Sequence, residues 1–94
     1  MNYTAGLSFF IPNDLTWRKD KFLDVLDDVD QIVYDDVYND GEDWCIDCTA
    51  KISCETTGDP VDAITNVINS LLPDDCPYWD FHYIDGSDGF HWRP

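Results

Sequence analysis

Basic side chains are scarce in this sequence. Five Lys and Arg residues stand against twenty Asp and Glu residues, which gives a formal net charge of −15 at pH 7. A surface of that charge repels phosphate backbones and anionic lipids and attracts basic protein surfaces. We therefore expect no direct binding to nucleic acid or to membranes, and we expect a basic protein as the partner.

Long apolar runs are missing as well. The opening "MNYTAGLSFFIPND" has no basic segment followed by an apolar run, and no stretch of the chain approaches the length of a bilayer span. We therefore expect a cytoplasmic protein. Thiols stay reduced there, so the cysteines are expected to pack as small apolar side chains. They are Cys45, Cys48, Cys54 and Cys76.

Apolar residues are nevertheless frequent enough for a core. They make up 44% of the chain, and aromatic residues make up 15%, which is more than a disordered acidic tail contains. A length of 94 residues suits one domain. We predict a single compact acidic domain over residues 1–94.

Apolar periodicity in the first half predicts a strand, a helix and a second strand. Apolar residues alternate from Tyr3 to Ile11, as in a strand with one buried face. Asn13 or Asp14 then offers a helix N-cap. The sequence does not define where this helix ends, because "QIVYDDVYND" could continue the helix or begin a strand. We favour a strand, since a longer helix would place Asp36 on the apolar face. The expected apolar helix positions are Phe22, Val25, Leu26, Val29 and Val33, with Asp20, Asp24, Asp27 and Asp28 opposite.

The second half repeats this order. "NDGE" predicts a hairpin, and residues 44–54 alternate as the clearest strand of the chain. "TTGDP" closes that strand and starts a helix with Asp59 as N-cap and Pro60 at the first position. An aromatic strand, "YWDFHYI", and the turn "DGSDG" follow. The β-α-β-β-α-β order predicts a ferredoxin-like α+β sandwich, an antiparallel sheet with two helices on one face and with room for a short extra strand.

Two segments of the sequence match metal sites in part, and neither fits well. Asp36, Asp40, Gly41 and Asp47 match positions 1, 5, 6 and 12 of a calcium loop, but Tyr38 occupies position 3. For zinc, "CIDC" lies inside an alternating strand, which sends its two cysteines to opposite faces. Cys54, Cys76, His82 and His91 would have to complete that site. We expect no metal and no cofactor, and we keep a calcium-binding protein as an alternative.

Catalytic motifs are also missing. The chain has no GxSxG, no phosphate-cradling glycine loop and no HExxH. His82 and His91 are expected to be ordinary surface or half-buried histidines. We predict that the protein is not an enzyme.

Glutamate is rare among the acidic residues: only Glu42 and Glu55 of the twenty are Glu, although Glu is the better helix former. The first helix also accepts the like-charge pairs Asp20–Asp24 and Asp24–Asp28, each unfavourable by about 0.2–0.5 kcal/mol. Aspartate holds its charge close to the backbone with fewer rotamers. A geometrically fixed array of this kind suits a binding surface.

The acids cluster in one segment, whereas residues 49–58 contain a single acid, and this argues against a surface charged only for solubility. We predict a contact patch in which aromatic side chains fix the orientation of the partner. Its acids are Asp24, Asp27, Asp28, Asp30, Asp35, Asp36, Asp40, Glu42 and Asp43, and its aromatic members are Tyr34 and Tyr38. Trp79 and Trp92 are further candidate anchors.

In size, acidity and expected architecture the chain resembles small phage-encoded DNA mimics that block restriction or CRISPR complexes. The resemblance implies a non-enzymatic inhibitor that binds the basic surface of a CRISPR effector or nuclease through its aspartate-rich face. If the chain is phage-encoded, the expected compartment is the cytoplasm of the host cell. Bacterial immunity proteins against basic nuclease toxins are similar in the same features, so an immunity protein is the alternative.

Overall fold

β1 (Asn2–Pro12) is the central strand of the sheet. Its residues Tyr3, Ala5, Leu7, Phe9 and Ile11 are all buried, which confirms the alternation expected from the sequence. β1 pairs antiparallel with a strand on each side. Every other residue of this strand therefore faces the main core.

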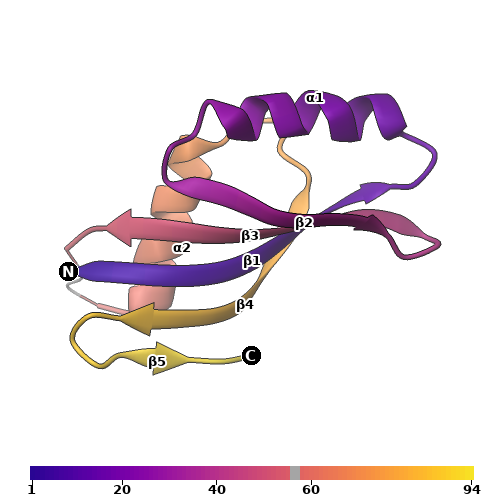
Figure 1. Cartoon of the computed structure of the whole chain (residues 1–94). Coiled ribbons are helices and arrows are strands. Elements are labelled where there is room, and N and C mark those ends of the chain that lie inside the picture. Colours follow the sequence, from indigo (N-terminus) through magenta and orange to yellow (C-terminus); the bar gives the residue numbers. More distant parts are fainter. Residues whose placement is uncertain (56–57) are drawn as a thin grey trace.

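The computed structural model describes residues 1–55 and 58–94 and has an α+β architecture (Figure 1). The five-stranded antiparallel sheet has the order β2-β3-β1-β4-β5. The edge strands are thus β2 and β5. After β1 the elements are α1 (Thr16–Asp27), β2 (Ile32–Asn39), β3 (Asp43–Ser53), α2 (Pro60–Leu71), β4 (Tyr78–Gly86) and β5 (His91–Trp92).

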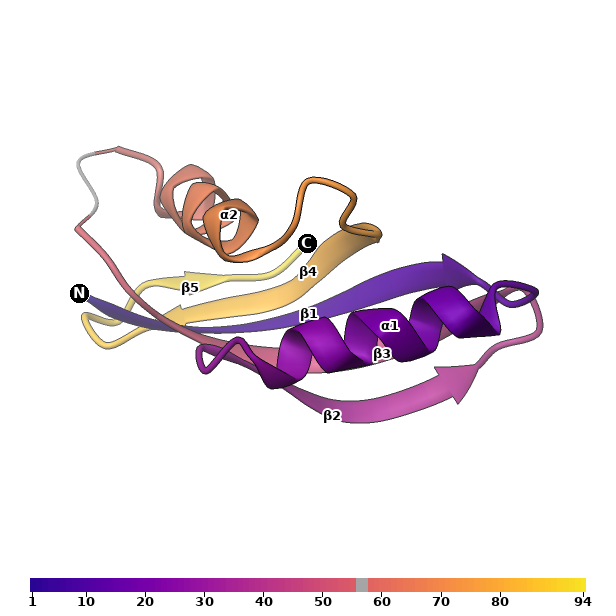
Figure 2. The same cartoon turned by 90° about the horizontal axis from the view of Figure 1, so that it is seen from above.

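Both helices contribute to one hydrophobic core. The ring of Phe22 in α1 meets that of Phe9 in β1 with centroids 4.7 Å apart, and Ile64 and Ile68 of α2 are fully buried in the same cluster. Figure 2 shows α1 and α2 as separate elements along the sheet, with β2 as its outermost strand beside α1. Neither of the two helices of the described residues covers the opposite face of the sheet.

The start of α1 differs from the prediction. Its N-cap is Leu15, without a side-chain cap, so Asn13 and Asp14 do not cap it. Asn13 is held elsewhere: its amide Nδ2 donates to the Gly41 carbonyl at 2.6 Å, and its N–H donates to the Glu42 carbonyl at 3.1 Å. Asn13, a predicted N-cap of the helix, thus makes its hydrogen bonds to the hairpin after β2.

The start of α2 agrees with the prediction. The Asp59 carboxylate accepts a hydrogen bond from the Val61 N–H at 3.0 Å, and Pro60 is the first helical residue. Thr56 and Thr57, which begin the predicted "TTGDP" segment, lie outside the described residues. Among the residues the structure does describe, no helix is long and apolar enough to cross a bilayer.

The end of α1 settles the alternative that the sequence left open. The helix stops at Asp27, and residues 32–39 form a strand, as favoured. Val33 was wrongly placed on the apolar side of the helix; it lies in β2 and is 59% exposed. Gly41 closes the following hairpin with φ of 101°, a conformation that glycine adopts without strain.

Candidate protein-binding surface

α1 separates its apolar and acidic side chains. Phe22 and Leu26 are buried beneath the helix, whereas Asp24 and Asp27 are exposed. This arrangement follows from helical periodicity, because residues three or four apart share a face. α1 therefore presents carboxylates to solvent beside β2 (Figure 1).

The C-terminal end of α1 concentrates negative charge. The last turn contains no basic residue, Asp28 is the C-cap, and Asp30 follows in the connection to β2. The C-terminus of a helix already carries a partial negative charge, and each additional carboxylate there is unfavourable by about 0.3–1 kcal/mol at an exposed site. These acids therefore do not serve the stability of the helix.

β2, an edge strand of the sheet, also bears exposed acidic residues. Asp35 and Asp36 are exposed, as are Tyr34 and Tyr38, with 37% and 43% of their surface accessible. Tyr34 lies opposite Cys48 of the main core and thus on the helix side of the sheet. Its pKa is raised by the nearby negative charge of Asp27 and by a hydrogen bond to that carboxylate. Tyr34 and Asp27 connect β2 with α1.

Asp36 and Tyr38 face the helix-free side of the sheet. Asp36 lies opposite Asp47, and Tyr38 lies opposite Cys45. The charge of Asp47 raises the pKa of Tyr38. Asp35 is left out of the β2–β3 register, and its carboxylate accepts a hydrogen bond from Thr49 Oγ1 at 2.6 Å. The predicted patch therefore wraps around an edge instead of forming one flat face.

The β2–β3 hairpin supplies the remaining acids. The Asp40 carboxylate accepts hydrogen bonds from the N–H groups of Asp43 and Glu42 at 2.8 and 2.9 Å, and these bonds lower its pKa. Asp40 therefore stabilises its own turn. Glu42 is exposed and Asp43 is half-buried. We call the nine predicted acids, from Asp24 to Asp43, the acidic edge.

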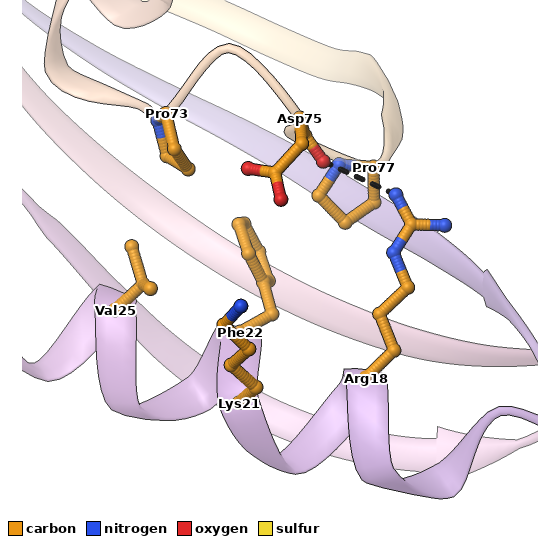
Figure 3. A pocket seen from close by; sticks show the side chains of 7 residues that line it. All are labelled: Arg18, Lys21, Phe22, Val25, Pro73, Asp75 and Pro77. Carbon is orange, nitrogen blue, oxygen red and sulfur yellow. Dashed lines mark hydrogen bonds between the residues drawn. The ribbon is translucent and has the colours of Figure 1, made fainter.

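No member of the acidic edge is neutralised by an ion pair within residues 1–55 and 58–94. Over that range, the acids in ion pairs are Asp20, Asp47 and Asp85. The three basic side chains of α1 make other contacts. Figure 3 shows Arg18 and Lys21 beside the loop of residues 73–77, where Arg18 Nη2 donates to the Asp75 carbonyl at 3.1 Å. Lys19 pairs with Asp20 at 2.6 Å and lies over the ring of Trp44. The acidic edge thus keeps its charge uncompensated.

The two tryptophans named as anchors lie away from this surface. Trp79 is in β4 and Trp92 is in β5, on the opposite side of the central strand from β2. Both are half-buried, and each packs against Phe81, with ring centroids 4.9 and 6.0 Å apart. They belong to the margin of the core. Of the predicted aromatic residues, only Tyr34 and Tyr38 lie on the strand that bears the acids.

A hydrogen-bonded cluster of Ser8, Asp47 and His82 was not predicted. Ser8 is 1% exposed in the middle of the helix-free face, its Oγ donates to Asp47 Oδ1, and His82 Nε2 lies 2.5 Å from the same Oγ. Ser8 separates the other two, whereas a hydrolytic triad needs the histidine in the middle and an accessible nucleophile. No sequence motif marks this cluster, because a register shift leaves His82 without a cross-strand partner.

The thiols of Cys48 and Cys76 are not poised for chemistry. Burial raises the pKa of Cys48 to about 12 and that of Cys76 to about 11, so both are protonated near neutral pH. Cys45 is only 2% exposed and lies between Tyr38 and Asp40. In the described part of the chain, no three His, Cys, Asp or Glu side chains converge as metal ligands would.

Comparison with known proteins gives no relative. No protein-family model, no curated protein and no solved structure matches this chain. The function of this protein is therefore inferred from the geometry and charge of its own residues.

Proposed function

We propose that this protein is a non-enzymatic inhibitor that binds the basic, nucleic-acid-binding surface of a CRISPR effector or nuclease through the acidic edge. The observation that carries the proposal is the set of nine acids on α1, its connection to β2, β2 itself and the β2–β3 hairpin, which have no ion pair among the described residues. Arg and Lys side chains that donate hydrogen bonds to phosphates would donate in the same way to such a row of carboxylates.

Aspartate spacing supports mimicry of a phosphate backbone. Neighbouring carboxylates on the helix surface are about 5–6 Å apart at the Cβ atoms, which is of the same order as the distance between successive phosphates. The short side chains limit how far each charge can move from this row. The unfavourable placement of acids at the C-terminus of α1 favours a binding role over one in stability.

We also propose that the architecture is of the ferredoxin-like type, with β5 as an added edge strand. The supporting observations are the β-α-β-β-α-β order of the first six elements and the central position of β1 between β3 and β4. This fold would use one side of the sheet for its helices and would leave the β2 edge open to a partner.

A DNA-displacement assay tests the proposed function. A fluorescent duplex is bound to a CRISPR effector, a restriction enzyme or a basic nuclease domain, and its anisotropy is followed as the protein is added at several NaCl concentrations. We expect displacement from at least one of them that weakens as salt rises, because the Debye length falls from about 10 Å at 0.1 M to about 3 Å at 1 M. Displacement that is indifferent to salt, or none from any of the three, would contradict the proposal.

A further inference from the structure

The end of α1 leads through a short connection into the start of β2 (Figure 1). An open groove lies at this junction. Its apolar floor contains Leu26 and Ile32, each 2% exposed, together with the half-buried Val29. Asp27, Asp30 and Tyr34 line the same groove and are exposed. The groove thus combines an apolar surface with two carboxylates and an aromatic ring.

The electrostatics of this groove are of one sign. The C-terminal carbonyl groups of α1 contribute about half an elementary negative charge, and Asp28 adds to it as the C-cap. Neither Asp27 nor Asp30 has an ion pair among the described residues. Asp27 interacts instead with Tyr34, another member of the groove. A cationic group entering here would meet no like charge from the residues that line it.

We infer that this groove binds one arginine side chain of the partner protein, an inference that rests on the proposed function. The aliphatic stem of arginine would cover the half-buried Val29, as long cationic side chains do on apolar surfaces. The planar guanidinium offers five donors to Asp27 and Asp30 and can also stack on the ring of Tyr34. Lysine matches this site less well, because its ammonium is compact and strongly hydrated.

A second copy of this chain is a poor occupant. Each copy carries a net charge of −15, so two acidic edges would repel one another. Arg93, which another copy could offer, already contacts Asp85 and lies over the ring of Tyr83. Charge complementarity therefore favours a basic partner.

Chemical-shift mapping with small probes tests the arginine site. The ¹⁵N-labelled protein is titrated at low salt with N-acetyl-arginine methylamide and, separately, with the corresponding lysine compound. We expect saturable shifts concentrated on residues 26–34 and tighter binding of the arginine probe. The double variant D27N/D30N should bind it about tenfold more weakly, because it loses two charge-assisted contacts. The matched control D74N/D75N, with the same change in charge, should bind within twofold of wild type.

Shifts spread evenly over all acids, equal binding of the two probes, or equal losses in both variants would overturn the arginine site. The probe titration and the DNA-displacement assay can fail independently. Diffuse shifts with retained DNA displacement would remove the groove and leave the proposed function standing. Localised arginine shifts without displacement would support the groove and contradict the inhibitor.

Discussion

Asp36 on β2 lies directly opposite Asp47 on β3. Like charges at facing positions of an antiparallel pair destabilise it, and such cross-strand pairs contribute roughly 0.2–1 kcal/mol. Asp47 has Ser8 and His82 beside it, but Asp36 has no ion pair among the described residues. The edge strand therefore keeps a carboxylate that its own sheet does not favour.

Asp36→Asn should raise the free energy of unfolding by about 0.2–1 kcal/mol, because it removes this repulsion. Urea denaturation followed by tryptophan fluorescence measures the change. Asp35→Asn is the control: the Asp35 carboxylate accepts a hydrogen bond from Thr49 Oγ1, so that variant should gain nothing. A loss of stability in Asp36→Asn would show that the repulsion is negligible.

Calcium should leave the melting temperature unchanged relative to EDTA. Asp36 and Asp47 lie opposite each other on paired strands, and the Asp40 carboxylate accepts hydrogen bonds within its own hairpin, whereas the calcium motif is a loop between two helices. A cation that binds only the native state at a hundred times its dissociation constant adds about 2.7 kcal/mol of stability. A clear rise in melting temperature with 1 mM CaCl₂ would restore the calcium-binding alternative.

Asp40 should make the hairpin sensitive to acid. Hydrogen bonds from Asp43 and Glu42 lower its pKa in the folded state below the ordinary value of 3.8. Its ionised form therefore stabilises the fold above pH 3.8, and this stabilisation is lost as the pH falls through the lowered pKa. Asp40→Asn should melt at a lower temperature than wild type at pH 7, with a smaller difference at pH 2.

Glu42→Gln is the control for this experiment, because it removes the same charge from the same hairpin without a side-chain hydrogen bond. Melting curves from pH 2 to pH 7 compare the three proteins. A constant difference between Asp40→Asn and wild type across this range would mean that the lowered pKa of Asp40 has no role in stability.

The sequence was most informative where one local rule decides a structure. Alternation along β1 placed Tyr3 to Ile11 in the core, and the Asp59–Pro60 pair marked the start of α2. The start of α1 was missed because Asn13 bonds to Gly41, a contact between residues 28 positions apart. Local propensity cannot anticipate a hydrogen bond made by the fold.

On the candidate surface too, local sequence rules predicted some features, and contacts between distant residues decided the others. Exposure of the acids on α1 followed from helical periodicity, but the wrapping of the acidic edge around β2 depends on the register with β3. The positions of Trp79 and Trp92 follow from the strand order, which periodicity does not encode. The Ser8 cluster joins three strands through one register shift, so no spacing in the sequence could reveal it.

Ser8 should fix the tautomer of His82. An ionised Asp47 can only accept, so the Ser8 hydroxyl donates to it and His82 must donate to Ser8 from Nε2 when its ring is neutral. Ring ¹⁵N shifts at high pH should therefore show the Nε2–H tautomer. Ser8→Ala should lower the free energy of unfolding by about 1 kcal/mol, whereas Ser53→Ala, at an exposed position, should not. Equal tautomer populations in wild type would refute this hydrogen-bond chain.

The most direct test of the proposed inhibitor compares two triple variants in the DNA-displacement assay. Asp24, Asp27 and Asp28 become Asn in one variant, and Asp62, Asp74 and Asp75 become Asn in the other, so both lose the same charge. We predict that the first variant stays folded, displaces DNA roughly tenfold less well and loses part of its salt dependence, since each exposed ion pair contributes about 0.2–1 kcal/mol. The second should stay within about twofold of wild type, the ratio expected if its acids make no contact. Equal losses in both variants would show that net charge, and not the acidic edge, drives binding.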